Sequence, residues 1–502
     1  MPLIDAAERF LRDVASDASL QPLRATAVAA ADRLGEPLRV AVCGQLSAGK
    51  STLVNALVGR RLAATGVGET TEVNWWFRHG SPERAVLRRR GGGEVTVPLD
   101  NPLPVLDDLD TEAVDAITIH VEHELLEDLV VIDTPGLFSP TGTTSERTRE
   151  LIGARTERAS ASADALLYLT HEVPGASRDV RTLAAFGALF GTVRKAPTNS
   201  LLLLSKCDEW WDATGADERP PLAIGAQLLG AHRDELWRHV WASVPAIGLL
   251  AEAATVPGAL DDAMVADLRT IAAHPKRRRA YRRARVPASL DVGVPPERVQ
   301  ALLDALGPYG LARALEHADA PGASADAVRA ALLEDSGLPV VGELLRRTFR
   351  ERSALIRTDA ALAALERSAL ARPDGLAEAD VSRVRAGVEE LRVSPGADGL
   401  RRLRALRIAM DERLRLAADA RRELRLLLAD GSPHERLGME PDVPLDRLAA
   451  DLPGRWRRWR ALENAVPASP ERRVVAAAAC EACEQLTREV ERMRSGRVRW
   501  AS

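Results

Sequence analysis

The fold of this chain is decided by one short stretch, Gly44-Gln45-Leu46-Ser47-Ala48-Gly49-Lys50-Ser51-Thr52. It reads G-x-x-x-x-G-K-S and lies between an apolar run, residues 40–43, and an amphipathic run, residues 52–58. A strand, a glycine loop and a helix in this order form a phosphate-binding loop, in which backbone N–H groups and the helix N-terminus face phosphate oxygens. We therefore expect this whole stretch to contact a nucleotide, with Lys50 on the β- and γ-phosphates and Ser51 on Mg²⁺.

The use of lysine supports this interpretation. The chain has 68 basic residues, and only four of them are lysines, at positions 50, 195, 206 and 276. An ammonium is a compact charge on a slim stem, whereas a guanidinium is a wide planar fork. Lys50 and Lys206 fall where a nucleotide site requires the slimmer group.

A second motif follows an apolar run at residues 129–132, and it reads Asp133-Thr134-Pro135-Gly136. In a D-x-x-G motif after a buried strand, the carboxylate lies near the water shell of Mg²⁺ and the glycine N–H lies near the γ-phosphate. We therefore expect Asp133 to assist metal binding and Gly136 to contact the γ-phosphate.

A third motif, Ser205-Lys206-Cys207-Asp208, follows the apolar run at residues 201–204. A carboxylate at Asp208 can accept two hydrogen bonds from the N1–H and N2–H₂ groups of guanine, an edge that adenine lacks. The stem of Lys206 can cover the ring, and Ser205 stands where Asn or Thr is usual. The sequence predicts GTP and GDP as ligands, with ATP as the alternative.

The segment between the first two motifs, residues 62–73, is rich in Gly and Thr, as a mobile switch loop is. We expect Thr71 to reach Mg²⁺ and the γ-phosphate, with Thr70 as the near alternative. An ordinary surface loop with incidental hydroxyl groups is the other interpretation.

Composition restricts the class of protein. The formal net charge is −4, which gives no overall attraction for nucleic acid or membrane. No apolar run approaches the length of a transmembrane helix, and residues 1–20 lack the apolar centre of a signal peptide. We expect a cytoplasmic protein whose four cysteines are reduced. Cys480 and Cys483 are expected to be packed helix thiols, with zinc or redox use as the alternative.

Three regions are expected. Residues 1–36 read as helices that join a helical bundle, residues 37–318 as an α/β P-loop GTPase domain, and residues 319–502 as the rest of the bundle or stalk. The α/β domain should have a mostly parallel sheet with helices on both faces. Residues 73–97 look like paired strands that turn at Gly91-Gly92-Gly93, and residues 244–250 look like a last strand.

Two arginine-rich stretches have alternative interpretations. Residues 276–285 could meet anionic lipid, but a solvated helix face paired with acids is the simpler interpretation, and nucleic-acid binding is disfavoured without an aromatic platform. In residues 455–460, Trp456 and Trp459 share a helix face. We expect them in the bundle core, with membrane anchoring as the alternative.

These motifs together resemble the bacterial dynamin-like GTPases. The resemblance lies in the P-loop with its Ser-Ala-Gly-Lys-Ser core, in residues 65–71 and in residues 133–137. Pro308-Tyr309-Gly310 and residues 455–460 are similar to the actinobacterial branch, which includes the isoniazid-inducible dynamin-like proteins of mycobacteria. The motifs are specific over residues 38–210, and the helical remainder is only loosely similar.

The resemblance implies a large GTPase that pairs through its G domains and acts on membranes, peripherally at the inner face of the plasma membrane. It implies that Ser47 contacts the phosphates and helps to place a monovalent cation, and that Thr71 positions the attacking water. Leu46 departs from the glutamine of eukaryotic dynamins and cannot orient water. The partner would be a second copy or a sibling GTPase. A soluble switch GTPase whose helices bind a protein partner is the alternative.

Overall fold

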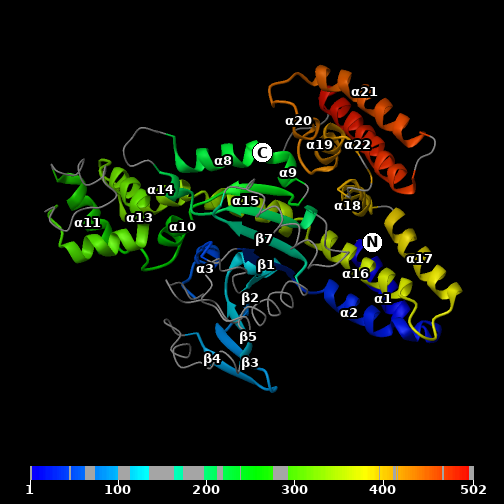
Figure 1. Ribbon diagram of the computed structural model, residues 1–502, viewed down its shortest axis with the longest axis horizontal. Helices are drawn as coiled ribbons and strands as arrows, with labels where there is room; N and C mark the ends of the chain where they lie inside the picture. Colours follow the sequence, from blue (N-terminus) through cyan, green and yellow to red (C-terminus); the bar gives the residue numbers. More distant parts are fainter. Residues whose placement is uncertain are drawn as a thin grey trace. The chain divides into compact units, whose positions relative to one another are not determined.

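The computed structural model describes residues 3–44, 47–62, 74–99, 114–134, 163–172, 197–211, 219–237, 239–274, 292–394, 396–410, 414, 416–465 and 469–496 (Figure 1). The chain divides into two compact units. One unit contains Met1–Gly35, Lys195–Thr198 and Arg357–Ser502, and the other contains Glu36–Arg194 and Asn199–Ile356. Each unit is described by itself.

The second unit is built on a nine-stranded sheet with the order β4-β3-β5-β2-β6-β1-β7-β8-β9. Strands β6, β1, β7, β8 and β9 are parallel, and β5 is parallel to β2. The β2–β6, β3–β4 and β3–β5 pairs are antiparallel. The strands are β1 (Leu38–Gly44), β2 (Asn74–His79), β3 (Arg84–Arg89), β4 (Glu94–Pro98), β5 (Val114–Val121), β6 (Leu129–Asp133), β7 (Ala165–Thr170), β8 (Ser200–Leu204) and β9 (Ala242–Pro245).

Helices follow most of the parallel strands. In this unit they are α3 (Lys50–Val58), α4 (Glu124–Asp128), η3 (Cys207–Trp210), α8 (Pro221–Ala231), α9 (Arg233–Leu236), α10 (Gly248–Thr255), α11 (Asp262–Ala273), α13 (Pro296–Ala318), α14 (Ala325–Ser336), α15 (Leu338–Leu345) and η4 (Arg346–Arg350). A short turn, η2 (Pro197–Asn199), precedes β8. The boundary expected near residue 318 lies inside this unit, because α14 and α15 pack with the sheet domain.

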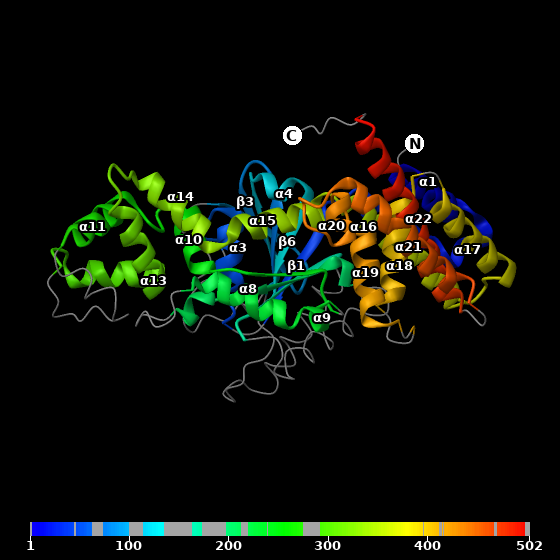
Figure 2. The same cartoon turned by 90° about the horizontal axis from the view of Figure 1, so that it is seen from above.

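The central strands are apolar on both sides because helices cover both faces of the sheet. In β1, Ala41 and Cys43 belong to a core with residues of α9, α10, α11 and α13. Their neighbours Val40 and Val42 belong to a second core with residues of α3 and α15. Figure 2 shows α8 and α9 on one side of the sheet and α15 on the other. The expected α/β fold, with a mostly parallel sheet and helices on both faces, is confirmed.

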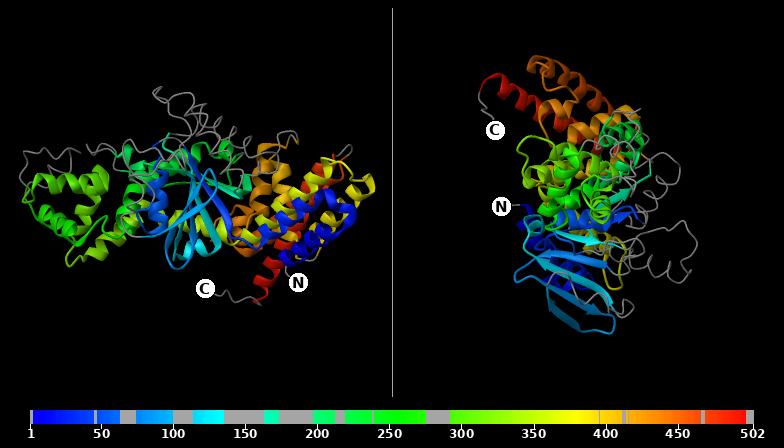
Figure 3. Two further views of the ribbon diagram at one scale, coloured as in Figure 1. Left: turned by 90° about the horizontal axis from the view of Figure 1, so that it is seen from below. Right: turned by 90° about the vertical axis from the view of Figure 1, so that its left-hand side faces the viewer.

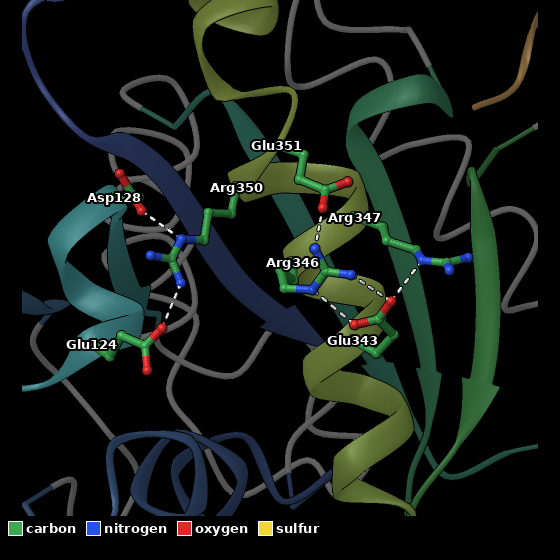
Figure 4. Close-up of polar contacts among 7 residues, drawn as sticks. All are labelled: Glu124, Asp128, Glu343, Arg346, Arg347, Arg350 and Glu351. Atoms are coloured by element: carbon green, nitrogen blue, oxygen red, sulfur yellow. Dashed lines mark hydrogen bonds and ion pairs between the residues drawn. The ribbon is translucent and has the colours of Figure 1, made fainter. Parts of the chain in front are cut away.

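Ion pairs connect η4, the helical turn after α15, to α4. The guanidinium of Arg350 lies 2.5 Å from Asp128 Oδ2 and 2.9 Å from Glu124 Oε1 (Figure 4). One turn earlier, Arg346 donates to both oxygens of Glu343 at 2.7 and 2.8 Å. Because α4 leads directly into β6, the contacts of Arg350 attach η4 to the start of β6. The groups are solvated, so their contribution to stability is small.

The first unit is entirely helical where it is described. It contains α1 (Leu3–Ser16), η1 (Ala18–Leu23), α2 (Arg24–Leu34), α17 (Glu378–Val393), α18 (Asp398–Ala409), α19 (Ala418–Leu428), α20 (Pro433–Leu437), α21 (Leu445–Glu463) and α22 (Pro470–Arg494), together with most of α16 (Ser353–Leu370). None of the helices in the described part of the chain is long and apolar enough to cross a membrane.

The two ends of the chain pack together in this unit. Figure 3 shows the blue N-terminal helices beside the yellow helix α17. Arg383 of α17 lies 3.0 Å from Asp17, and a Cβ built on Gly387 would lie 2.4 Å from the Phe10 ring. Gly387 therefore leaves room for the Phe10 ring between the two helices. The expected bundle of N-terminal and C-terminal helices is confirmed.

Both tryptophans of the 455–460 stretch lie within the helical unit. Trp459 is 3% exposed, and its Nε1 donates to Glu423 Oε1 at 3.1 Å. Trp456 is partly buried, and its Nε1 donates to Glu484 Oε1 at 3.0 Å. A buried indole that finds a partner for its N–H is an ordinary core residue. These contacts support the core interpretation. Residues 276–285, the other arginine-rich stretch, lie outside the described residues.

Candidate functional site

The phosphate-binding loop joins β1 to α3. Gly44 ends β1 with φ of 154°, and a Cβ built there would lie 2.2 Å from the carbonyl oxygen of Leu169 on β7. Only glycine allows that approach. Ser47 and Gly49 have φ of 58° and 82°, and α3 begins at Lys50, directly after Gly49. The sequence thus produces the strand, loop and helix that a phosphate site requires. Gln45 and Leu46 lie outside the described residues.

Within this loop, Lys50 is held in a buried position. Lys50 is only 7% exposed, and this burial lowers the pKa of its ammonium group. The carboxylate of Asp133 and the thiol of Cys43 act in the opposite direction. A buried cation at the start of a helix is a strong partner for an anion, because little water screens it.

Asp133 ends β6 beside the start of α3. It is fully buried, and Ser51 Oγ donates to its Oδ2 at 2.8 Å. Burial raises the pKa of Asp133 to about 6, although Lys50 and the Ser51 hydroxyl counteract this rise. Its second oxygen, Oδ1, accepts no hydrogen bond from any residue that the structure describes.

These residues fit a hard divalent cation. Asp133 Oδ1 accepts no hydrogen bond from a described residue, and Ser51 Oγ lies 2.8 Å from Asp133 Oδ2. Together these atoms offer the oxygen ligands that Mg²⁺ prefers. Elsewhere in the described part of the chain, no group of three or more His, Cys, Asp or Glu residues could hold a metal. Cys480 and Cys483 are buried free thiols whose pKa values burial raises to about 11 and about 12.

The residue after Asp133 fixes the second motif to the first. Thr134 is buried, and both its N–H and its Oγ1 donate to the carbonyl oxygen of Val42, at 3.3 and 2.9 Å. The start of the D-x-x-G motif is therefore attached to the strand that leads into the phosphate loop. The structure brings Lys50, Ser51 and Asp133 together. Thr71 and Gly136, which complete the expected site, lie outside the described residues.

The predicted base-binding motif follows β8. Ser205 is buried, and its N–H and Oγ donate to the carbonyl oxygen of Thr170, at 2.7 and 3.1 Å. Its hydroxyl thus joins β8 to β7. Lys206 has φ of 54° and lies 3.4 Å from Glu209. Burial raises the pKa of Asp208, its backbone hydrogen bond counteracts this, and Glu209 raises the pKa further.

Sequence reasoning missed one neighbour of Asp208, which is Gly307 of α13. A Cβ built on Gly307 would lie 3.6 Å from Asp208 Oδ2 and 3.4 Å from Leu249 Cδ2. Gly307 has φ of 66° and ψ of 174°, and it interrupts α13 just before Pro308. The Gly-Pro pair was a visible signal of a helix break. Nothing in the sequence showed that this break lies against the motif at residues 205–208.

Comparison with known proteins places part of the chain in a family. The model of the dynamin family matches residues 40–184. Isoniazid-induced protein IniC of Mycobacterium tuberculosis is 40% identical over 162 residues, which are 32% of this chain and 32% of that protein. Dynamin-like protein 2 of Campylobacter jejuni is 29% identical over 24% of this chain and 20% of its own length. GTPase Era of Erythrobacter litoralis is 27% identical over 38% of this chain and 44% of its own length.

The matches therefore span less than half the length of these curated relatives. Among solved structures, one of an oligomerised bacterial dynamin pair covers 99% of this chain and 75% of its own, with 12% identity and a TM-score of 0.37. Era in complex with MgGDPNP and ribosomal RNA covers 42% of this chain and 51% of its own, with 16% identity and a TM-score of 0.24. At these scores neither structure bears on function. Residues 40–184 thus match the model of the dynamin family, and this part of the chain is similar to bacterial dynamin-like proteins.

Proposed function

We propose that this protein binds GTP with Mg²⁺ and hydrolyses it to GDP and phosphate. The observation that carries the proposal is the cluster of Lys50, Ser51 and Asp133, where the carboxyl ends of β1 and β6 meet the N-terminus of α3. Ligands of parallel α/β sheets bind at this edge. The chain's match to the dynamin family supports GTP rather than another nucleotide.

Each residue then has a task. The backbone N–H groups of the loop from Gly44 to Thr52 hold the phosphates, with Lys50 as their charge partner. Ser51, Asp133 and Thr71 hold Mg²⁺, which neutralises charge on the β- and γ-phosphates when bound. Gly136 donates its N–H to the γ-phosphate, and Ser47 contacts the phosphates. Asp208 accepts the guanine N–H groups, while Ser205 and Lys206 support the base.

A charge-removal variant tests this assignment. Lys50→Ala should weaken binding of a fluorescent GDP by about a hundredfold, because a charge-assisted contact in a dry site is lost. Arg60→Ala, a half-exposed cation shortly after α3, is the matched control and should bind normally. Tight binding of ATP with weak binding of GTP would contradict the role given to Asp208.

Turnover tests the switch residue separately. Thr71→Ala should leave GDP binding largely intact and slow hydrolysis, because its hydroxyl acts on water and Mg²⁺ rather than on the base. Hydrolysis at the wild-type rate would transfer the role to Thr70.

We further propose that the GTPase acts peripherally on the inner face of the plasma membrane, by pairing G domains of two copies or of a sibling protein. This proposal rests on the bacterial dynamin-like relatives. Co-sedimentation with anionic vesicles, with and without GTP, separates this proposal from a soluble switch that binds a protein partner. Sedimentation that needs neither vesicles nor GTP would contradict the membrane role.

A further inference from the structure

The helix that begins at the phosphate loop, α3, is fixed along its length to α10. The two helices lie side by side (Figure 1 and Figure 2). Gly248, Glu252 and Thr255 share one face of α10, because they follow one another at about one helical turn. A Cβ built on Gly248 would lie 3.7 Å from Thr52 Cγ2. At the other end of this face, Thr255 Oγ1 donates to the carbonyl oxygen of Ala56 at 3.1 Å.

Glu252 is the central polar residue of this contact. It is 4% exposed, and its Oε1 accepts hydrogen bonds from Asn55 Nδ2 at 3.1 Å and from Arg61 Nε at 3.2 Å. A buried carboxylate costs free energy unless it is paired and hydrogen-bonded. Asn55 has no exposed surface, whereas the Arg61 side chain is about half exposed. The amide of Asn55 is therefore the partner that water can least replace.

Asn55 is held with its amide in one orientation. Its Nδ2 faces the Glu252 carboxylate, which accepts hydrogen bonds and cannot donate them when it is ionised. Its Oδ1 consequently faces the other way, where it accepts the N–H of Leu62 at 3.0 Å. Leu62 is 5% exposed and belongs to the apolar core of the sheet. One buried amide thus ties the chain that follows α3 to α10.

This fixed point precedes the segment that leads to Thr71. The proposed role of Thr71 requires the segment after Leu62 to hold one hydroxyl group beside Mg²⁺ and the γ-phosphate. Holding a chain in one arrangement costs conformational entropy, and the cost is lower when one end of the chain is already fixed. Lys50 and Ser51, the proposed phosphate and metal ligands, lie at the opposite end of α3 from Leu62.

We infer that Asn55 and Glu252 are positioning residues for GTP hydrolysis. The inference rests on the proposed GTPase function and gives a task to two buried residues outside the proposed nucleotide contacts. Asn55 fixes the start of the chain that carries Thr71, and Glu252 fixes the amide of Asn55. Disturbing this pair should slow the step that needs Thr71. Binding of GDP, which depends on the phosphate loop and Asp208, should stay largely intact.

The test reverses the direction of one hydrogen bond. Asn55→Asp places a second carboxylate against Glu252 and should lower kcat for GTP about tenfold at pH 8, where two carboxylates are least able to share a proton. Its affinity for a fluorescent GDP should change by less than about threefold.

The double variant Asn55→Asp with Glu252→Gln restores one donor and one acceptor between the two side chains. The carboxylate at position 55 still accepts the N–H of Leu62. The kcat of the double variant should therefore return to within about threefold of the wild type.

Two further variants separate positioning from a general loss of stability. Asn55→Ala removes both side-chain hydrogen bonds without adding a charge, so the test does not depend on the folding of Asn55→Asp. Its kcat should also fall while GDP binds normally. Asp267→Asn is the matched control, since it removes another carboxylate, 7% exposed and 2.6 Å from Arg298, from the same unit. Its melting temperature should fall, and its kcat should stay that of the wild type.

Restored turnover in the double variant, with GDP affinity kept throughout, supports the inference. Three results would overturn it: wild-type kcat in both single variants of Asn55, a loss of GDP affinity as large as the loss of kcat, or a double variant no faster than Asn55→Asp. These results leave the proposed hydrolysis standing. A wild-type protein that binds GDP and does not hydrolyse GTP would instead refute the proposed hydrolysis, and this inference with it.

Discussion

At the scale of single residues, the buried carboxylate of Asp133 lowers the stability of the folded protein. A carboxylate with no exposed surface and one oxygen without a described donor is poorly solvated when no cation is bound. Burial has raised its pKa to about 6. The proposed Mg²⁺ site is therefore expected to be less stable when empty than a neutral side chain would make it.

Asp133→Asn should therefore separate stability from metal binding. Without nucleotide and metal, the variant should be as stable as the wild type or more stable, with a free energy of unfolding up to about 3 kcal/mol higher. Its melting temperature should rise accordingly. The dependence of GDP affinity on Mg²⁺ should be largely lost. Thermal melts and titrations with and without Mg²⁺ measure both. Asp326→Asn, whose side chain is 91% exposed in the wild type, is the control and should change neither. A marked fall in the melting temperature of Asp133→Asn would show that the charge stabilises the empty site.

Gly307 allows a second prediction at this scale. Its φ of 66° and ψ of 174° are disfavoured for any residue with a Cβ, and it lies against Asp208 and Leu249. Gly307→Ala should lower the free energy of unfolding by about 1–3 kcal/mol, and with it the melting temperature. It should also weaken GDP binding, because the added methyl group would press on Asp208, the proposed partner of the guanine base. Gly342→Ala, in α15 with open space around it, should be neutral or stabilising. Equal effects of the two substitutions would remove the reason for linking α13 to the base site.

Asp133 and Gly307 differ in how much of their surroundings could be predicted from the sequence. The meeting of Lys50, Ser51 and Asp133 followed from motifs at the ends of strands, since parallel strands bring their carboxyl ends to one edge. The contact between Gly307 and Asp208 could not be inferred, because it joins residues far apart in sequence through the packing of a helix. Propensities describe local backbone and say nothing of such neighbours.

At the scale of elements, strands were easier to recognise than their limits. The β3–β4 hairpin with its turn at Gly91 to Gly93 is confirmed, and Gly92 and Gly93 have φ of 89° and 92°. Residues 244–250 were predicted as one strand, which is wrong. β9 ends at Pro245, and α10 begins at Gly248. A short apolar run has the same pattern in a buried strand and in the first turn of a buried helix.

The packing of the two tryptophans of α21 within the helical unit gives a prediction about its stability. Trp459→Ala should destabilise the helical unit by about 3–5 kcal/mol, because it leaves a cavity and removes the indole hydrogen bond to Glu423. Trp456→Ala should cost less, since that ring is only partly buried. Helical circular dichroism during urea unfolding measures the difference. Equal and small losses for both variants, with reduced vesicle binding, would instead favour membrane anchoring.

At the scale of the whole molecule, the order of the chain explains the two units. Helices from both ends form one unit, and the sheet and its covering helices form the other. The sequence predicted the joining of the two ends, because apolar faces at helical spacing occur before and after the sheet domain. It placed the end of the sheet domain near residue 318, whereas the division into compact units falls after residue 356. The helices α14 and α15 carry the same amphipathic pattern as those of the bundle, so composition could not separate them.

The last prediction concerns assembly. Leu46 provides no group that can orient water, so one copy acting alone should hydrolyse GTP slowly. Pairing of G domains would order the switch residues around the γ-phosphate and fix the attacking water. Specific activity should then rise with protein concentration, since the active species forms by mass action. GDP with a fluoride mimic of phosphate should shift the protein toward a dimer in light scattering, and Lys50→Ala should abolish this shift. Activity per molecule that stays constant over about a hundredfold range of concentration, alone or with a sibling GTPase, would favour a switch that works as a single copy.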